Sequence, residues 1–259
     1  MPDQVHHVKL RNAPLKRMVC QLRYPPELGF DASVVRPLQK QLADEYPTAT
    51  SEQAVAGVTL SPDGKPLKFD IKNVFRFAAE DRATTVQVTD DFIAFETSNY
   101  SRFPDFADRW RRILSAAVQV FELRKQQRLG LRYTNVIEQP SFKTAGEWKG
   151  SIRDHLLSAV IEVAGICDAT ESIAEQSIVL QTAQGTCLFR HGFPAISTLN
   201  EPIPQGYVLD IDSYDEGLQD VNIDRHMAML DAWNHQSYQL LRGAVSDELW
   251  ASFEPEESP

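Results

Sequence analysis

The sequence predicts an α+β protein made of two copies of one unit, in which long helices cover one side of antiparallel strands. Three observations support this prediction. The tripeptide Leu-Arg-Tyr occurs twice in strand-like runs, at residues 22–24 and 131–133. The same order of elements follows each copy: a strand, a helix, several strands and a second helix. The triplets Ser-Asn-Tyr at 98–100 and Asp-Ser-Tyr at 212–214 also recur in that order.

In the first half, apolar and polar side chains alternate from Lys16 to Tyr24, which is the period-two pattern of a half-buried strand. A helix is expected from about Ser33 to Tyr46, and Pro47 ends it. Four or five short strands should then form an antiparallel meander, near residues 55–60, 67–71, 74–78, 84–89 and 92–97.

A strongly amphipathic helix closes the first half over residues 101–125, because its apolar side chains recur at spacings of three and four. The second half repeats the order of elements. The expected segments are a strand at 128–138, a helix around 148–163, strands near 172–182, 186–191 and 206–212, and a helix from about 222.

The two copies are offset by 109 residues at Arg132 and Arg23 (132 − 23) and by 114 at Tyr214 and Tyr100 (214 − 100). A small insertion explains the difference, and the proline-rich connection 192–205 is its expected place. The chain therefore divides into a first repeat (1–125), a second repeat (126–251) and a frayed tail (252–259).

Charge and composition exclude several classes of protein. The net charge of −10 argues against broad nucleic-acid binding, since it repels a phosphate backbone. The halves differ, with +2 for residues 1–125 (18 basic, 16 acidic) and −12 for residues 126–259 (8 basic, 20 acidic). No apolar run approaches the roughly 18 residues that span a bilayer, so no membrane partner is expected.

A cytoplasmic location is expected from the N-terminus and the cysteines. Residues 1–7 lack the basic start and apolar stretch of a secretory signal. Cys20, Cys167 and Cys187 are scattered and form no C-x-x-C pair, which favours reduced core thiols over a metal site.

Three short motifs occur in the chain: N-A-P-L at residues 12–15, L-x-L-R-Y-x-N at 129–135 and Y-x-L-D-x-D at 207–212. With the closing helix, they resemble a sporadically distributed bacterial family of uncharacterised proteins of this size. That family carries no assigned activity, so the resemblance implies no catalytic residue. The doubled order of elements is similar, by analogy only, to a helix-grip or TATA-binding-protein-like arrangement, and such an analogy does not transfer function.

Two arginines and an asparagine are the first candidate ligand-binding residues. Arg132 and its counterpart Arg23 lie on strands, where a guanidinium group can clamp a carboxylate or phosphate. Asn135 follows Arg132 near the end of its strand. The structural alternative is that each arginine pairs with an acid or a carbonyl inside the protein, and that Asn135 closes a turn.

Asp210 and Asp212 are the remaining candidates, on one face of a strand that leads into an acidic cluster with Asp215 and Glu216. Oxygen ligands at this spacing can hold a hard cation such as Mg²⁺. The sequence lacks the loop of an EF-hand and a His-carboxylate motif, so a solvated strand end is favoured and no metal or cofactor is predicted.

The basic stretch 109–128 and His226 have structural interpretations. The stretch is expected to be a solvated helix face, because its aromatic residues belong to the buried stripe. His226 is expected to be a hydrogen-bonded residue at the core boundary. No nucleophile elbow, zinc-helix motif or glycine-rich phosphate loop is present, so no catalytic residue is assigned.

The leading hypothesis is a noncatalytic binding or assembly module for a protein partner or small ligand, as an accessory of a bacterial defence or regulatory system. A homodimer is an open alternative for its assembly. A competing hypothesis is an enzyme acting on a phosphorylated or nucleotide-like substrate in a cleft between the halves, with Arg132, Asn135, Asp210, Asp212 and His226. A third is nucleic-acid binding by a saddle-shaped sheet, which requires a basic concave face.

Overall fold

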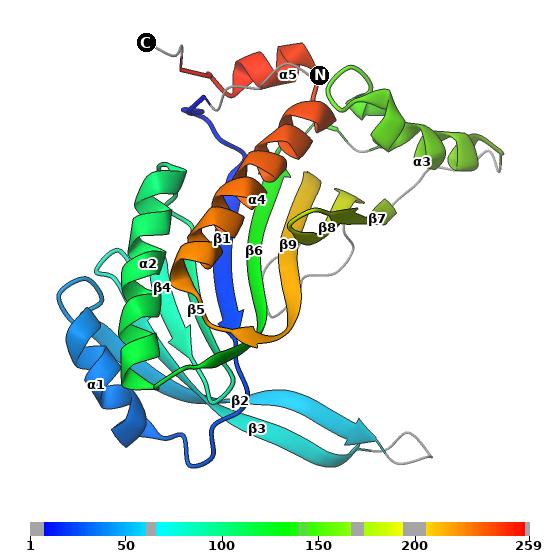
Figure 1. Cartoon of the computed structure of the whole chain (residues 1–259). Helices are drawn as coiled ribbons and strands as arrows, with labels where there is room; N and C mark the ends of the chain where they lie inside the picture. Colours follow the sequence, from blue (N-terminus) through cyan, green and yellow to red (C-terminus); the bar gives the residue numbers. More distant parts are fainter. Residues whose placement is uncertain are drawn as a thin grey trace. The chain divides into compact units, whose positions relative to one another are not determined.

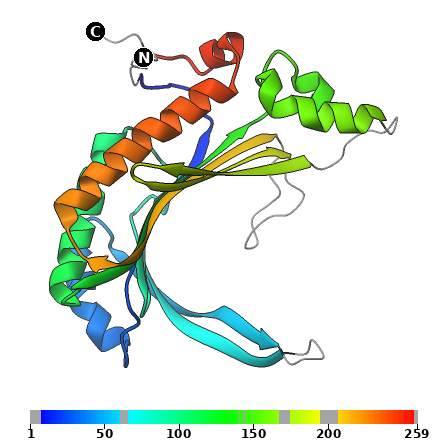
Figure 2. The same ribbon diagram turned by 45° about the vertical axis from the view of Figure 1, so that its right-hand side comes forward.

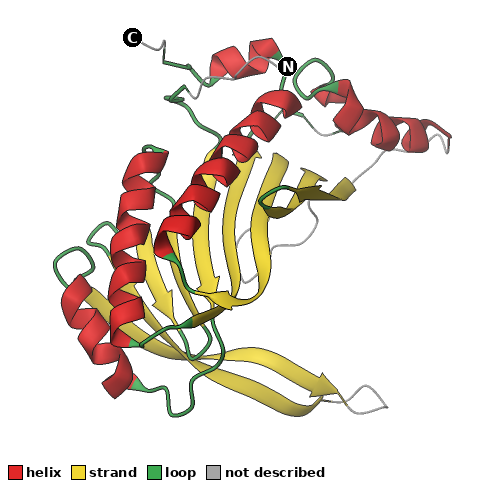
Figure 3. Ribbon diagram, in the orientation of Figure 1, coloured by secondary structure: helices red, strands yellow, loops and turns green. Residues whose placement is uncertain are grey.

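The computed structural model describes residues 8–60, 66–139, 141–142, 144–166, 174–193 and 206–256. The strands are β1 (Leu15–Arg23), β2 (Thr48–Leu60), β3 (Pro66–Ala78), β4 (Thr84–Val88), β5 (Phe92–Thr97), β6 (Lys125–Ile137), β7 (Ala174–Thr182), β8 (Gly185–Phe193) and β9 (Tyr207–Asp220). The helices are α1 (Ala32–Leu42), α2 (Phe103–Val120), the 3₁₀ turn η1 (Ala145–Trp148), α3 (Asp154–Ile166), α4 (Ile223–Ala244) and α5 (Asp247–Ser252) (Figure 3).

The described strands form one open antiparallel sheet of nine strands in the order β2-β3-β4-β5-β1-β6-β9-β8-β7. This confirms the predicted α+β class and the antiparallel pairing. The first strands of the two predicted repeats, β1 and β6, are neighbours in the sheet. The duplication itself and the analogy to known folds stay predictions.

The chain forms two compact units, and each is described by itself. Unit 1 comprises residues 1–18, 131–214 and 229–259, and unit 2 comprises residues 19–130 and 215–228. Strands β1, β6 and β9 and helix α4 each contribute residues to both units. The division therefore differs from the predicted repeats, which are continuous along the sequence.

The core of unit 2 lies between the helices α1 and α2 and one face of strands β3, β4 and β5 (Figure 1). Alternation makes this possible, since β4 is buried at every second residue. Helix α2 contributes the fully buried Trp110 and the buried Ile113 and Leu114, as its periodicity predicts. Asp31 caps the N-terminus of α1, because its carboxylate accepts a hydrogen bond from Ser33 N at 2.7 Å.

The core of unit 1 lies between the C-terminal part of α4 and one face of β6, β9 and β8 (Figure 2). Trp233 fixes the helix, because its Nε1 donates to the carbonyl of Gln184 at 3.1 Å in the β7–β8 turn. Trp148 and Tyr207 are buried in this core of unit 1. The described part of the predicted tail pairs with the N-terminal segment, since Asn12 N donates to Phe253 O at 3.0 Å.

Several predicted boundaries were wrong. The segments 67–71 and 74–78 are one strand, β3, which pairs with β2 from Thr48↔Ala78 to Leu60↔Pro66. The adjacent polar residues Lys72 and Asn73 suggested a turn, but they continue the ladder opposite Ala54 and Gln53, and a register shift lies between Val55 and Gly57.

Two further elements differ from the prediction. The expected helix at 148–163 is the short turn η1 followed by α3, and β9 continues eight residues beyond 212 to Asp220. The helix predicted over 101–125 ends at Val120, and Lys125 already belongs to β6, because Glu122 has a φ of 49° that ends the helical path. The connection 194–205, Cys167 and residues 257–259 lie outside the described residues.

Candidate functional site

Arg132 and Asp210 form a bidentate ion pair between neighbouring strands of unit 1. Arg132 Nε donates to Asp210 Oδ1 at 2.6 Å, and its Nη2 donates to Oδ2 at 2.8 Å. Alternation along β6 explains the geometry. Tyr133, on the opposite side of the strand from Arg132, points to α4, where its hydroxyl donates to Asn234 Oδ1 at 2.8 Å. Arg132 therefore lies on the face of the sheet away from α4.

Arg190 contacts the same carboxylate from the third strand. Asp210 and Arg190 are directly opposite in the β8–β9 ladder. Arg190 Nε and Nη2 donate to Asp210 Oδ2 at 2.8 and 2.6 Å. The Asp210 side chain is only 6% exposed, whereas those of Arg132 and Arg190 are 39% and 31% exposed. One buried carboxylate thus orients two guanidinium groups that both reach solvent.

Asp212 shares this face, and Asn135 does not. Asp212 follows Asp210 by two residues on β9 and is opposite Leu188 of β8, so its side chain lies on the same side as Asp210. Asn135 is buried on the α4 side of β6, where its Nδ2 donates to Leu209 O at 3.2 Å. We call the face that carries Arg132, Arg190, Asp210 and Asp212 the Asp210 face.

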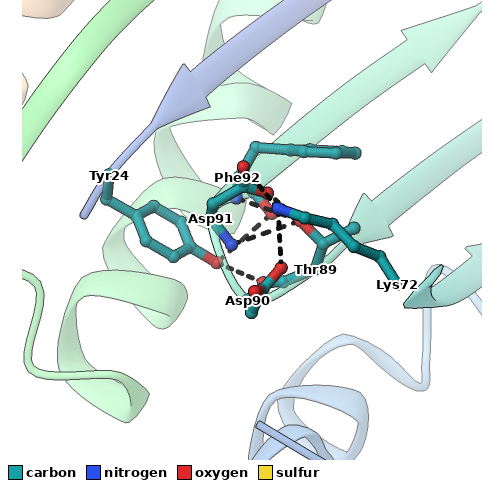
Figure 4. A network of polar contacts seen from close by, with 6 residues as sticks. All are labelled: Tyr24, Lys72, Thr89, Asp90, Asp91 and Phe92. Atoms are coloured by element: carbon teal, nitrogen blue, oxygen red, sulfur yellow. Dashed lines mark hydrogen bonds and ion pairs between the residues drawn. The ribbon is translucent and has the colours of Figure 1, made fainter. Parts of the chain in front are cut away.

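Arg23 belongs to unit 2, at the exposed end of β1. The residue after it, Tyr24, anchors the β4–β5 turn, because its hydroxyl donates to Thr89 O at 2.8 Å (Figure 4). Lys72 Nζ contacts Asp91 Oδ2 at 2.6 Å and Asp90 Oδ1 at 3.1 Å in the same turn. These contacts tie β1, β3 and the turn together, so their role is structural.

The electrostatic environment of the β4–β5 turn favours the charged form of the Asp91 carboxylate. Burial opposes ionisation of Asp91, but hydrogen bonds from Lys72 and Thr89 and the charges of Lys72 and Arg23 outweigh it, so the pKa of Asp91 is lowered. Burial, followed by the nearby carboxylates, raises the pKa of Tyr24, which keeps its hydroxyl protonated as a donor.

His226 also belongs to unit 2, where its Nε2 hydrogen-bonds to Gln126 Oε1 and both side chains are buried. Burial, together with the charge of Arg225, lowers the pKa of His226 to about 4. The predicted hydrogen-bonded core histidine is confirmed. The basic stretch forms ion pairs within unit 2: Arg111–Asp224 at 2.8 Å, Arg112–Glu45 at 3.0 Å, Lys125–Asp220 at 2.9 Å and Arg128–Glu216 at 3.4 Å.

Sequence reasoning missed Arg190. Arg190 lies in a strand-like run, and alternation places it on the opposite face of the strand from Phe189 and His191. No motif distinguishes it from other strand residues. In the described part of the chain, no group of three or more His, Cys, Asp or Glu side chains is placed to hold a metal ion. Among the described helices, none is long and apolar enough to cross a membrane.

No protein-family model matches this sequence, and no curated protein is significantly similar to it. The resemblance of its three motifs to a bacterial family therefore stays an expectation.

Proposed function

We propose that the chain is a noncatalytic binding module that docks a protein partner on the Asp210 face of unit 1. One observation carries the proposal: a buried carboxylate fixes two arginine side chains that remain 39% and 31% exposed. Side chains that are ordered before binding lose less conformational entropy when a partner arrives. Arginine is also enriched among the residues that dominate binding energy at protein interfaces.

Charge balance favours a protein partner over a polyanion. The Asp210 face carries two arginines and two aspartates, so its formal charge is zero (2 − 2), and the whole chain carries −10. Nucleic-acid affinity comes mainly from the release of counterions by a positive surface. A protein surface can instead offer groups of both signs, including a carboxylate for Arg190, which gives complementary contacts.

The hydrogen bonds of Asp210 support binding rather than catalysis. Its Oδ2 accepts three of them and its Oδ1 one, all from Arg132 and Arg190. A general base must present an oxygen to the proton that it removes. The competing enzyme also required Asn135, which lies on the other side of β6. A role as an accessory of a bacterial defence or regulatory system rests on the motif resemblance and adds no residue.

Quantitative affinity capture from a native lysate tests the proposal. The full chain, Arg190→Ala and the control Arg36→Ala are immobilised at equal density, and the captured proteins are counted by mass spectrometry. Arg36 is exposed on α1, so its removal changes the charge by the same amount without touching the Asp210 face. Arg190→Ala should keep its fold, because Arg132 still pairs with Asp210.

The proposal predicts a partner that wild type and Arg36→Ala capture equally and that Arg190→Ala loses. With that partner purified, the substitution should weaken binding about tenfold or more, since each tenfold step corresponds to about 1.4 kcal/mol. Equal capture by Arg190→Ala, or turnover of a small substrate that Asp210→Asn abolishes, would remove the proposal.

A further inference from the structure

A pocket of about 380 Å³ lies entirely within unit 2. Its walls are the paired ends of β4 and β5, the connection 99–102 and the first turns of α2. This volume is at the small end of the range of roughly 300–1,000 Å³ that is typical of small-molecule sites. None of the residues that form the Asp210 face belongs to the pocket.

The buried inner wall of the pocket carries two hydroxyl groups. Thr84 and Thr97 are opposite in the β4–β5 ladder, are 2% and 4% exposed, and hydrogen-bond through their Oγ1 atoms at 3.0 Å. The rings of Phe95 and Phe106, which also line the pocket, pack against each other with centroids 4.7 Å apart. A ligand that enters the pocket therefore meets a preformed wall.

Six charged side chains line the pocket, and their formal charges sum to zero: Arg102, Arg109, Arg112, Asp81, Asp105 and Asp108. Four of them are already engaged. Arg102 Nε donates to Asp105 Oδ2 at 2.9 Å. Arg112 pairs with Glu45, and Asp81 accepts a hydrogen bond from Asn99 Nδ2 at 3.2 Å.

The other two, Asp108 and Arg109, are adjacent on α2 and exposed. Neither forms a hydrogen bond or an ion pair with any residue in the described ranges. The charge of Arg109 nevertheless acts inside the pocket. The pKa of Asp81 is lowered first by its hydrogen bond from Asn99 and also by Arg109, and that of Asp105 first by Arg102 and also by Arg109.

We propose that this pocket binds a small zwitterion of the amino-acid class, with its carboxylate on Arg109 and its ammonium group on Asp108. Arg109 and Asp108 are the cation and the anion of the lining that can pair with a ligand. The hydrogen bonds and ion pairs of Arg102, Arg112 and Asp81 stabilise the surrounding walls. A phosphorylated ligand would bring several negative charges next to three aspartates, and like charges at short distance repel. A ligand that carries a single cation would leave the guanidinium of Arg109 without a partner.

Isothermal titration of the full chain with the standard amino acids tests the proposal. At least one of them is expected to bind. For each binder, the N-acetyl derivative removes the positive charge and the carboxamide removes the negative charge. Both analogues should bind at least about tenfold more weakly than the parent, which corresponds to about 1.4 kcal/mol for each lost ion pair.

Paired variants separate the pocket from general charge effects. Arg109→Ala and Asp108→Asn should each weaken binding about tenfold or more. Two controls should leave it unchanged: Arg111→Ala, which removes a neighbouring arginine that pairs with Asp224, and Asp44→Asn, which removes an exposed carboxylate outside the pocket. Thermal unfolding of each variant checks that it is folded.

Three outcomes would overturn the proposal: no binding by any of the amino acids, equally tight binding of the single-charge analogues, or wild-type affinity in Arg109→Ala and Asp108→Asn. None of these outcomes bears on the Asp210 face, because the two sites share no residue.

Discussion

Arg132 and Asp210 are 78 residues apart in the chain, and two parallel hydrogen bonds of 2.6 and 2.8 Å join them across β6 and β9. The same carboxylate binds Arg190 of β8, so three strands share one buried anion. Removing either partner of a buried ion pair leaves an uncompensated charge, so the three side chains hold one another in a single arrangement. Here that arrangement leaves the Arg132 and Arg190 side chains 39% and 31% exposed, which is why we place the docking site on this face.

Asp210→Asn should destabilise the protein by about 2–4 kcal/mol. The substitution removes the charge that two guanidinium groups need, and the loss of one partner of a buried pair costs about 3–5 kcal/mol, reduced here because both arginines reach solvent. Urea unfolding followed by tryptophan fluorescence measures the change. The exposed Asp44→Asn serves as the control, and equal stabilities of the two variants would contradict the role given to Asp210.

Alanine at two glycines of unit 1 should have opposite effects. A Cβ atom on Gly206 would lie 2.2 Å from the carbonyl oxygen of Ile137, a backbone atom that cannot easily move, so Gly206→Ala should cost about 2–4 kcal/mol. A Cβ atom on Gly243, in α4, meets nothing within 4 Å, and Gly243→Ala should stabilise by about 0.5–1 kcal/mol. Thermal unfolding gives the change in melting temperature of each variant. A change in the same direction for both variants would contradict these contacts.

Lowering the pH should reduce the free energy of unfolding through the protonation of His226. Its pKa falls from the ordinary value of 6.5 to about 4 on folding, so between these values the unfolded chain binds a proton that the folded chain does not. The contribution of His226 is complete above pH 6.5 and is lost as the pH falls toward 4, by about 2–3 kcal/mol in all.

His226→Gln keeps an amide that can reach Gln126 from the position of Nε2 but does not titrate. The difference in unfolding free energy between wild type and this variant should therefore shrink from pH 7 to pH 4.5. A difference that is independent of pH would show that His226 is not held in its neutral form.

Tyr24→Phe should destabilise the protein by about 1–2 kcal/mol. The change removes the hydroxyl that donates to Thr89 O and Phe92 O and leaves buried carbonyls with fewer donors. Hydrogen exchange at the amides of residues 89–92 should speed up more than exchange in α1, because the β4–β5 turn loses its anchor. Unchanged exchange in the turn would mean that the contacts of Lys72 suffice.

Much of the fold could be predicted from the sequence, because period-two and helical patterns report burial directly. The alternation from Lys16 to Tyr24 located β1 to within one residue at each end, and the aromatic stripe located α2. Patterns failed where burial is low. Lys72 and Asn73 of β3 are adjacent polar residues within a long hairpin, and nothing in their order distinguishes a ladder from a turn.

The candidate site was predictable only in part. Arg132 and Asp210 were singled out for separate reasons, but their pairing depends on which strands become neighbours, and that is a tertiary fact. Asn135 differs from Arg132 by an odd number of residues on one continuous strand, so the expected strand at 128–138 already implied that it faces the other way. Arg190 has no motif, and only the register of β8 against β9 identifies it.

Site-specific photo-crosslinking in the native cell tests the central claim most directly. A photoreactive amino acid replaces Leu188, which is opposite Asp212 on the Asp210 face, or Asp231, which is exposed on α4. We predict that position 188 yields a discrete adduct with one protein partner, that Arg190→Ala abolishes this adduct, and that position 231 does not give it. The same adduct from both positions, or none from position 188, would contradict the assignment of the Asp210 face as a docking surface.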